Sequence, residues 1–205
     1  MITLYSGTPG AGKSLHLASR LYHWMQYRNA PIIANFSCDF STIKKPKGQF
    51  IYIDNSQLTP ERLIWFSKNY EQYIGRRSRE GEILLVIDEA QLLFNSREWV
   101  KTDRAEWCAF FTQHRKLGYE VVLVAQMDRM LDRQIRGLVE YEWIHRKCSN
   151  FGVAGKLLGV LFGGKLFVAV KVWYPMKEKV GSEFFVYRKR FSDIYDTYAL
   201  FAIPK

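Results

Sequence analysis

An octapeptide directly behind a short apolar run constrains the fold of this chain more than any other feature. Residues Gly7-Thr8-Pro9-Gly10-Ala11-Gly12-Lys13-Ser14 complete the pattern G-x-x-x-x-G-K-[ST], and they follow the run Ile2-Thr3-Leu4-Tyr5. Behind the octapeptide, apolar side chains recur at helical spacing, at Leu15, Ala18, Tyr22 and Met25. A strand, a glycine-rich loop and a helix in this order predict a phosphate-binding loop.

The residue types in the octapeptide fit the chemistry of a triphosphate. Glycines let the backbone turn its N–H groups towards a phosphate, while Lys13 supplies a cation for the β- and γ-phosphates and Ser14 a hydroxyl ligand for Mg²⁺. A chance glycine-rich turn is the alternative, and the flanking strand and helix argue against it. We therefore expect ATP, or another nucleoside triphosphate, at a site formed by Gly7, Thr8, Pro9, Gly10, Ala11, Gly12, Lys13, Ser14 and Leu15.

A second apolar run ends in two adjacent acidic residues. Ile83-Leu84-Leu85-Val86-Ile87 is typical of a strand covered on both faces of a parallel sheet, and Asp88-Glu89 follow it. Beside a phosphate-binding loop this is a Walker B pattern, in which Asp88 holds Mg²⁺ through water and Glu89 orients or deprotonates the attacking water. Two ordinary carboxylates at a strand end are the alternative. Adjacent acids favour hydrolysis over phosphoryl transfer to a small acceptor, because a kinase must exclude water.

Gln126 ends a further buried run, Val121-Val122-Leu123-Val124-Ala125. A polar side chain at the carboxyl end of the strand after Walker B lies beside the γ-phosphate, where it can sense whether that phosphate is present. The alternative is a strand-end amide in contact with solvent. We favour the sensor role.

The rest of the chain predicts an α/β fold in a single domain over residues 1–205. Over residues 1–140, strand patterns alternate with helix patterns, which predicts a mainly parallel sheet with helices on both faces. Over residues 141–205, strand patterns at 141–145, 165–173 and 183–187 have no helix pattern between them. We expect an antiparallel β addition there, followed by a short C-terminal helix. Residues 151–170 are interpreted as a glycine-rich loop and a strand, with a membrane-inserted hairpin as the alternative.

Charge and cysteine content restrict partners and setting. The net charge of +10 appears in clusters such as Lys44-Lys45-Pro46-Lys47 and Arg188-Lys189-Arg190, which suggests nucleic acid or an anionic membrane surface as a neighbour, with a solvated loop as the alternative for any single cluster. Cys38, Cys108 and Cys148 form no C-x-x-C pair, and the four histidines have no metal-ligand spacing, so we expect a reduced setting without a zinc site.

Taken together, these motifs resemble the N-terminal ATPase domain of the zonula occludens toxin (Zot) family, which includes the gene I assembly proteins of filamentous bacteriophages. The resemblance covers nearly all of the chain. Beyond the two nucleotide motifs, it rests on Gln113-His114-Arg115-Lys116-Leu117-Gly118 leading into the strand that ends at Gln126, and on Ile135-Arg136-Gly137-Leu138-Val139.

The resemblance implies a motor ATPase of the FtsK/HerA type on the cytoplasmic face of the host inner membrane, supporting phage assembly and extrusion. It implies a homo-oligomeric ring, with phage single-stranded DNA or capsid proteins, and other phage assembly proteins, as partners. The family's transmembrane anchor would lie beyond residue 205. In such a ring an arginine reaches the γ-phosphate of the next subunit. Arg115 is the first candidate, followed by Arg97 and Arg104.

Two other classes stay open from sequence. A small-molecule kinase would share the phosphate-binding loop, and residues 76–79 would form its lid. A non-hydrolytic ATP-binding scaffold would bind nucleotide tightly and turn it over negligibly. The sequence carries no base-specific motif that separates ATP from GTP.

Overall fold

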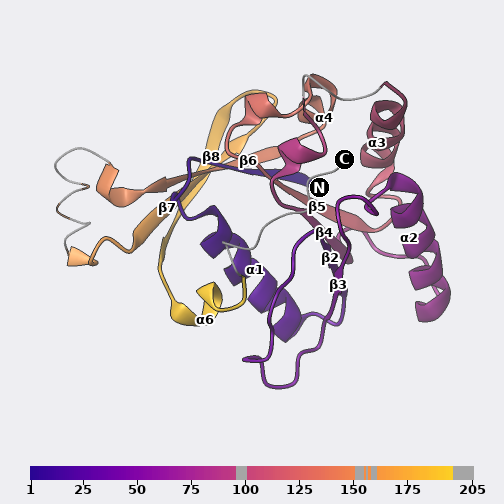
Figure 1. Cartoon of the computed structure of the whole chain (residues 1–205), viewed down its shortest axis with the longest axis horizontal. Helices are drawn as coiled ribbons and strands as arrows, with labels where there is room; N and C mark the ends of the chain where they lie inside the picture. The colour runs from indigo at the N-terminus through magenta and orange to yellow at the C-terminus, as the bar shows by residue number, and fades with distance from the viewer. Residues whose placement is uncertain (96–100, 151–154, 156, 158–160, 196–205) are drawn as a thin grey trace.

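One mixed β-sheet organises the molecule (Figure 1). The computed structural model describes residues 1–95, 101–150, 155, 157 and 161–195. Its eight-stranded sheet has the order β3-β2-β4-β5-β1-β6-β7-β8. The strands are β1 (Ile2–Ser6), β2 (Pro31–Ala34), β3 (Gln49–Tyr52), β4 (Ile83–Ile87), β5 (Tyr119–Val124), β6 (Tyr141–Lys147), β7 (Leu166–Trp173) and β8 (Glu178–Val186).

Strand β6 corrects the predicted start of the antiparallel addition. The strands from β3 to β6 in the sheet order are all parallel, and β6 pairs with β1 through Tyr5↔Trp143. Antiparallel pairing begins at β7 and continues to β8. The crossover that carries α4 (Arg133–Gly137) returns the chain parallel to β1. This crossover holds only a five-residue helix, and its pattern did not indicate the direction of β6.

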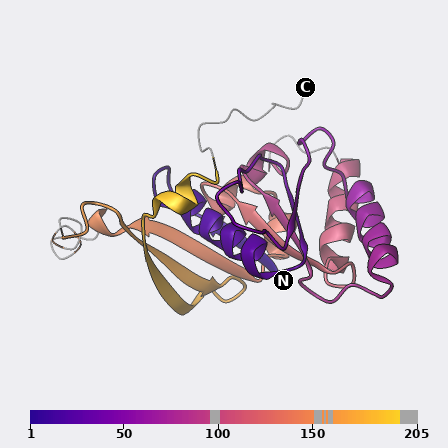
Figure 2. The same cartoon turned by 90° about the horizontal axis from the view of Figure 1, so that it is seen from below.

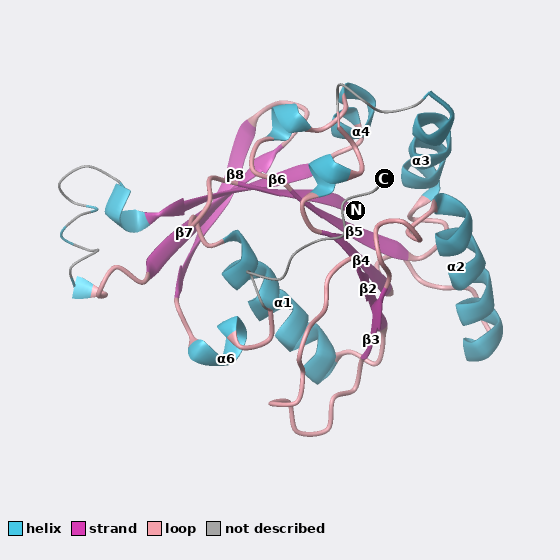
Figure 3. Ribbon diagram, in the orientation of Figure 1, coloured by secondary structure: helices cyan, strands magenta, loops and turns pink. Residues whose placement is uncertain are grey.

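Helices cover both faces of the sheet, as the alternation of patterns predicts (Figures 2 and 3). One face carries α1 (Lys13–Tyr27) and α6 (Lys189–Ser192). The other face carries α2 (Pro60–Ile74), α3 (Lys101–Gln113) and α4. Three short 3₁₀ turns, η1 (Ala90–Leu92), η2 (Asp128–Met130) and η3 (Cys148–Asn150), follow β4, β5 and β6.

Local chemistry sets the ends of α2. The Thr59 hydroxyl accepts a hydrogen bond from the Arg62 N–H at 3.3 Å, and Pro60 occupies the first turn, where its missing N–H costs no helical hydrogen bond. Gly75 ends the helix at φ +67°, a left-handed conformation that a residue with a Cβ adopts only with strain.

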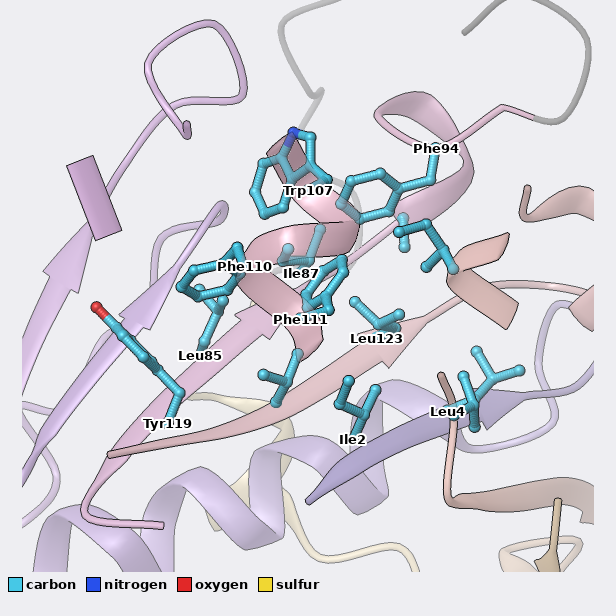
Figure 4. Packing of buried hydrophobic residues seen from close by; sticks show 14 of the residues in the cluster. Ile2, Leu4, Leu85, Ile87, Phe94, Trp107, Phe110, Phe111, Tyr119 and Leu123 are labelled. Carbon is cyan, nitrogen blue, oxygen red and sulfur yellow. The ribbon is translucent and has the colours of Figure 1, made fainter. Parts of the chain in front are cut away.

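Alternate side chains along the central strands build two hydrophobic cores. Figure 4 shows the core on the α2–α3 side, where Trp107, Phe110 and Phe111 of α3 pack over strand residues such as Leu85 and Leu123. The second core lies under α1 and includes Leu17, Leu21, Ile32, Val86 and Val124. Since β4 is completely buried, its carboxyl end is held rigidly between the two cores.

Residues 151–170, which the sequence predicts to form a glycine-rich loop and a strand, are described only in part. Residues 151–154, 156 and 158–160 lie outside the described residues, and the predicted strand at 165–173 is β7. Among the described residues, no helix has the length and apolar content to cross a membrane.

Candidate nucleotide-binding site

The carboxyl edge of the parallel sheet collects the predicted functional residues. Strands β4, β5 and β1 are adjacent and parallel, so their carboxyl ends meet at one edge. Strand β1 leads into the Gly7–Ser14 loop, β4 into Asp88 and Glu89, and β5 into Gln126. Pairing of Tyr5 with Val124 and of Ile87 with Leu123 sets the three ends level. Open α/β sheets bind ligands at this edge.

The Gly7–Ser14 loop wraps around the lysine side chain. Gly7, Gly10 and Gly12 have φ angles of +141°, +74° and +94°, so the turn needs glycine at these positions. The Lys13 ammonium donates hydrogen bonds to the carbonyl oxygens of Gly7 at 2.6 Å and Thr8 at 3.3 Å. Lys13 also begins α1, whose first-turn N–H groups face the loop. The loop therefore presents a cation and a helix N-terminus to the same small volume.

Two glycines of the loop are also fixed by close neighbours. A Cβ at Gly7 would lie 2.6 Å from the carbonyl oxygen of His145 on β6. A Cβ at Gly12 would lie 2.8 Å from the ring of Phe167 on β7 and 3.3 Å from that of Phe185 on β8. The antiparallel hairpin β7–β8 thus packs directly on the phosphate-binding loop, which the sequence did not predict.

Neutral donors hold the carboxylate of Asp88. One of its oxygens accepts the Glu89 N–H at 2.8 Å, and the other accepts the hydroxyl proton of Tyr195. The Asn35 side chain binds the backbone of Asp88 on both sides, donating to its carbonyl at 2.8 Å and accepting from its N–H at 2.7 Å. Glu89 has a left-handed φ of +46°, and its carboxylate accepts a hydrogen bond from the Gln91 amide.

Asn35 and Tyr195 are site residues that sequence reasoning missed. They lie 53 and 107 residues from Asp88 in the chain, and no local pattern predicts contacts of that range. Asn35 follows β2 directly, in register with the end of β4. A polar residue at the end of a neighbouring parallel strand was the only available signal for it.

Burial shifts the pKa values of the charged groups in opposite directions. Desolvation raises the pKa of Asp88 above its ordinary value, although the Tyr195 hydrogen bond opposes the shift. Desolvation lowers the pKa of Lys13, and the charges of Glu89 and Asp88 oppose that shift. The acidic pair of β4 is therefore close enough to Lys13 for their charges to act on one another.

The oxygen donors at this edge fit Mg²⁺. Ser14 offers a hydroxyl and Asp88 a carboxylate, which are hard ligands of the kind that Mg²⁺ prefers. Among the described residues no group of three or more His, Cys, Asp or Glu side chains gathers as a complete metal cage. A magnesium ion bound with a nucleotide takes its remaining ligands from phosphates and water, and Ser14 and Asp88 are the donors that this edge offers to such an ion.

Gln126 lies where the sequence predicts. Its carbonyl oxygen accepts a hydrogen bond from the Gly7 N–H at 3.1 Å, which ties the end of β5 to the start of the loop. Gln126 also lines a pocket of 510 Å³ beside the loop, together with Gly7, Thr8 and cationic residues that include Arg146 and Lys147. The location agrees with a sensor, and the sensing role stays a prediction.

Two histidines form a buried pair beneath the loop. His145 Nδ1 lies 3.0 Å from the carbonyl oxygen of Ser6, which can only accept, so this nitrogen carries the proton. His145 Nε2 then accepts from His16 Nδ1 at 2.8 Å. Burial lowers the pKa of His16 to about 3 and that of His145 to about 4, so both are neutral at pH 7. The sequence did not predict this contact, which joins α1 to β6 across 129 residues.

The candidate arginines have different places. Arg115 follows α3 and lies near the amino end of β5, at the edge of the sheet opposite Asp88, where it binds Glu140 and, at 3.3 Å, Glu80. Arg104 binds Asp132 at 3.2 Å, and Arg97 lies outside the described residues. Within one chain Arg115 is therefore distant from the nucleotide motifs. Its role across a subunit interface stays a prediction.

Comparison with known proteins gives consistent matches. The sequence model of the family described as zonular occludens toxin (Zot) matches residues 1–195. The "Gene 1 protein" of Enterobacteria phage I2-2 is 36% identical over 86 residues, which are 40% of this chain and 24% of that protein. The match thus spans about a quarter of the length of this relative.

Solved structures share the fold. The N-terminal domain of zonular occludens toxin from Neisseria meningitidis superposes with a TM-score of 0.59 at 19% identity, covering 95% of this chain and 98% of that one. The genome packaging NTPase B204 of Sulfolobus turreted icosahedral virus 2, solved with ATP-gammaS, gives a TM-score of 0.54 at 14% identity, covering 89% of this chain and 95% of that one. The fold is that of a P-loop NTPase, as the sequence predicts.

Proposed function

Because the chain belongs to the zonular occludens toxin (Zot) family, we propose that it is a magnesium-dependent ATPase motor that powers the assembly and extrusion of a filamentous phage. The curated relatives are phage gene 1 proteins, and the shared fold includes a viral genome packaging NTPase. The family and the fold support nucleotide chemistry in a phage. The arrangement of charges at the carboxyl edge of the sheet supports hydrolysis.

The proposed roles follow from the positions of the side chains. Backbone N–H groups of the Gly7–Ser14 loop hold the phosphates, and Lys13 exchanges its loop carbonyls for phosphate oxygens. Ser14 and Asp88 hold Mg²⁺, which when bound neutralises the charge that develops on the phosphates. Glu89 takes a proton from the attacking water, and Gln126 senses the γ-phosphate. Asn35 and Tyr195 keep Asp88 in place.

One observation carries this proposal: the Lys13 ammonium and the Asp88-Glu89 carboxylates act on one another at the end of three adjacent parallel strands. A kinase would need an acceptor site from which water is excluded. This chain instead has two adjacent carboxylates, Asp88 and Glu89, at the end of β4, and such a pair favours water as the acceptor.

The motor activity needs more than one copy of the chain. We propose a homo-oligomeric ring in which Arg115 of one subunit reaches the γ-phosphate bound to its neighbour. Such an arginine stabilises negative charge in the transition state. The ring would act at the cytoplasmic face of the host inner membrane, on phage single-stranded DNA or capsid proteins.

The experiment that tests the proposal measures the specific ATPase rate against protein concentration, with Mg²⁺ and then with EDTA. Lys13→Ala is measured in parallel, because it removes the cation and leaves the loop glycines. We expect a Lys13-dependent and Mg²⁺-dependent rate that rises steeply with concentration, because each site is completed at an interface. Addition of single-stranded DNA tests whether DNA is the moved polymer.

Three outcomes would contradict the proposal in different ways. Negligible turnover with tight ATP binding at every concentration would identify a non-hydrolytic scaffold. A specific ATPase rate that is independent of protein concentration would contradict the proposal that subunits assemble into a ring to complete each site. A phosphorylated small molecule among the products would identify a kinase.

A further inference from the structure

The side of α1 that faces away from the sheet carries a row of aromatic rings. Tyr22, His23 and Tyr27 lie along this side; His23 and Tyr27 are one helical turn apart, and Tyr22 is next to His23. The rings of Tyr22 and His23 are 5.7 Å apart, and those of His23 and Tyr27 are 6.1 Å apart with an interplanar angle of 10°. Tyr27 is 64% exposed. Figure 2 shows α1 in front of the sheet, and Phe191 of α6 packs against Tyr22 and His23.

Cations from three separate segments flank these rings. At one end, the Arg190 guanidinium of α6 lies 5.4 Å from the centre of the Tyr22 ring. At the other end, the Arg28 guanidinium lies 4.2 Å over the Trp24 ring. The Lys47 N–H donates to the carbonyl oxygen of Met25 at 2.8 Å, which holds the lysine-rich turn against the end of α1. We call Tyr22, His23, Tyr27, Arg28, Lys47 and Arg190 the α1 outer surface.

The charge of this surface is not neutralised internally. The nearby carboxylates already have other partners, since Glu120 binds Arg20 at 2.5 Å and Asp193 binds Lys189 at 2.7 Å. Within the described residues, Arg28, Lys47 and Arg190 form no ion pair, and the turn that holds Lys47 adds Lys44 and Lys45. An uncompensated row of cations attracts a polyanion.

A hollow lies in this surface near the C-terminal end of α1. It has a volume of 390 Å³ and is lined by Arg20, His23, Trp24, Tyr27, Arg28 and Glu120. Flat rings on its walls and an arginine at its rim are suited to a flat heterocycle, because a base can stack on a ring while the guanidinium binds the adjoining phosphate.

We propose that the α1 outer surface binds single-stranded nucleic acid. Phosphates lie along Arg190, Arg28 and Lys47, and bases stack on the exposed rings. A duplex would hide its base faces from these rings, so the arrangement selects single strands. The exposed side chains in the row are tyrosine and histidine rather than long aliphatic residues, which favours stacking over insertion into a lipid surface.

The proposed surface is separate from the nucleotide site. Tyr22 lies nine residues after Lys13 on the same helix, about 14 Å along its axis. Binding at the α1 outer surface therefore does not rest on ATP hydrolysis, and it can be measured without nucleotide. If the chain is the proposed motor, this surface gives it a contact with a single-stranded polymer.

Fluorescence anisotropy with a labelled oligothymidylate, in the absence of nucleotide, tests the proposal. Tyr27→Ala should weaken binding about 10-fold, because it removes a ring on which a base stacks. The double variant Arg28→Ala with Lys47→Ala should lower the slope of log K against log salt concentration by about 1.4, since each phosphate contact contributes about 0.7. Tyr73→Ala and Lys68→Ala are the matched controls, because both residues are exposed on α2 over the opposite face of the sheet.

Absence of wild-type binding at low salt would overturn the proposal. Binding that is equal in Tyr27→Ala, the double variant and the α2 controls would overturn the location. Vesicles of neutral lipid with a minority of anionic phosphatidylglycerol provide the second arm: stronger binding to them, lost in the same variants, would identify a membrane surface instead. Lys13→Ala should bind the oligonucleotide as wild type does, so a failed ATPase and a failed nucleic-acid surface are distinguishable.

Discussion

The two edges of the parallel sheet hold their carboxylates in different ways. At the amino edge, arginines pair with the glutamates that precede or begin the strands: Arg76 with Glu82 before β4, Arg20 with Glu120 at β5, and Arg115 with Glu140 before β6. At the carboxyl edge, Asp88 and Glu89 are bound by neutral donors, and within the described residues neither forms an ion pair.

This difference indicates that the carboxylates of the amino edge stabilise the fold, whereas those of the carboxyl edge serve the chemistry of the site. A carboxylate with an arginine partner has its charge compensated within the chain. Asp88 is buried without such a partner among the described residues, and desolvation raises its pKa, so a cation that arrives from outside would stabilise its charged form. The predictions below test whether the two edges differ in function as their partners indicate.

The largest expected effect on kcat belongs to an arginine at the amino edge. Such an effect would show that this edge also takes part in catalysis, which its ion pairs do not indicate. If Arg115 reaches the γ-phosphate of a neighbouring subunit, Arg115→Ala should lower kcat by about 10³-fold and leave ATP affinity unchanged. The measurement is steady-state ATPase at a protein concentration that saturates assembly, with ATP affinity from a fluorescent analogue. Arg76→Ala is the matched control, since Arg76 is also exposed and paired with a glutamate at the same edge. Equal rates for both variants would make Arg115 purely structural.

A smaller effect is expected for the acidic residue at the carboxyl edge. Glu89→Gln should lower kcat by about 10²-fold, because a general base contributes about 10²–10⁴-fold, while the amide preserves size and the hydrogen bond from Gln91. ATP should still bind. Glu120→Gln, at the amino edge, should keep the wild-type rate. A wild-type kcat in Glu89→Gln would show that Glu89 is not the general base.

The smallest catalytic effect is expected for the tyrosine that holds Asp88. Tyr195→Phe removes one neutral donor from a buried carboxylate and should lower the free energy of unfolding by about 1–3 kcal/mol, with kcat within about threefold of wild type. Urea unfolding measures the first quantity. Tyr119→Phe is the matched control, because the Tyr119 hydroxyl is buried and donates to a neutral carbonyl oxygen, that of Leu63, at 2.7 Å. A loss of kcat as large as in Glu89→Gln would show that Tyr195 takes part in catalysis.

Features encoded by neighbouring residues were predictable from the sequence. The loop and α1 follow from a contiguous motif, and the ends of β4 and β5 follow from continuous apolar runs. Contacts between distant segments were not predictable, because no periodicity encodes them. Two sets of contacts therefore appear only in the folded chain. One is the hydrogen bond between His16 and His145, and the other comprises the hydrogen bonds that Asn35 and Tyr195 form with Asp88. The direction of β6 was missed for a related reason, since a strand pattern does not tell which neighbour it joins.

The contact between Gly12 and the β7–β8 hairpin has a mechanical consequence. Because position 12 has no side chain, the rings of Phe167 and Phe185 rest directly on the backbone of the phosphate-binding loop. Strand β8 is the last strand of the sheet, with one side unpaired by other strands. Close-packed rings resist compression, so a load applied to this free edge reaches the loop through two rings without crossing the hydrophobic cores. A displacement of the β7–β8 hairpin would therefore act directly on the phosphate-binding loop.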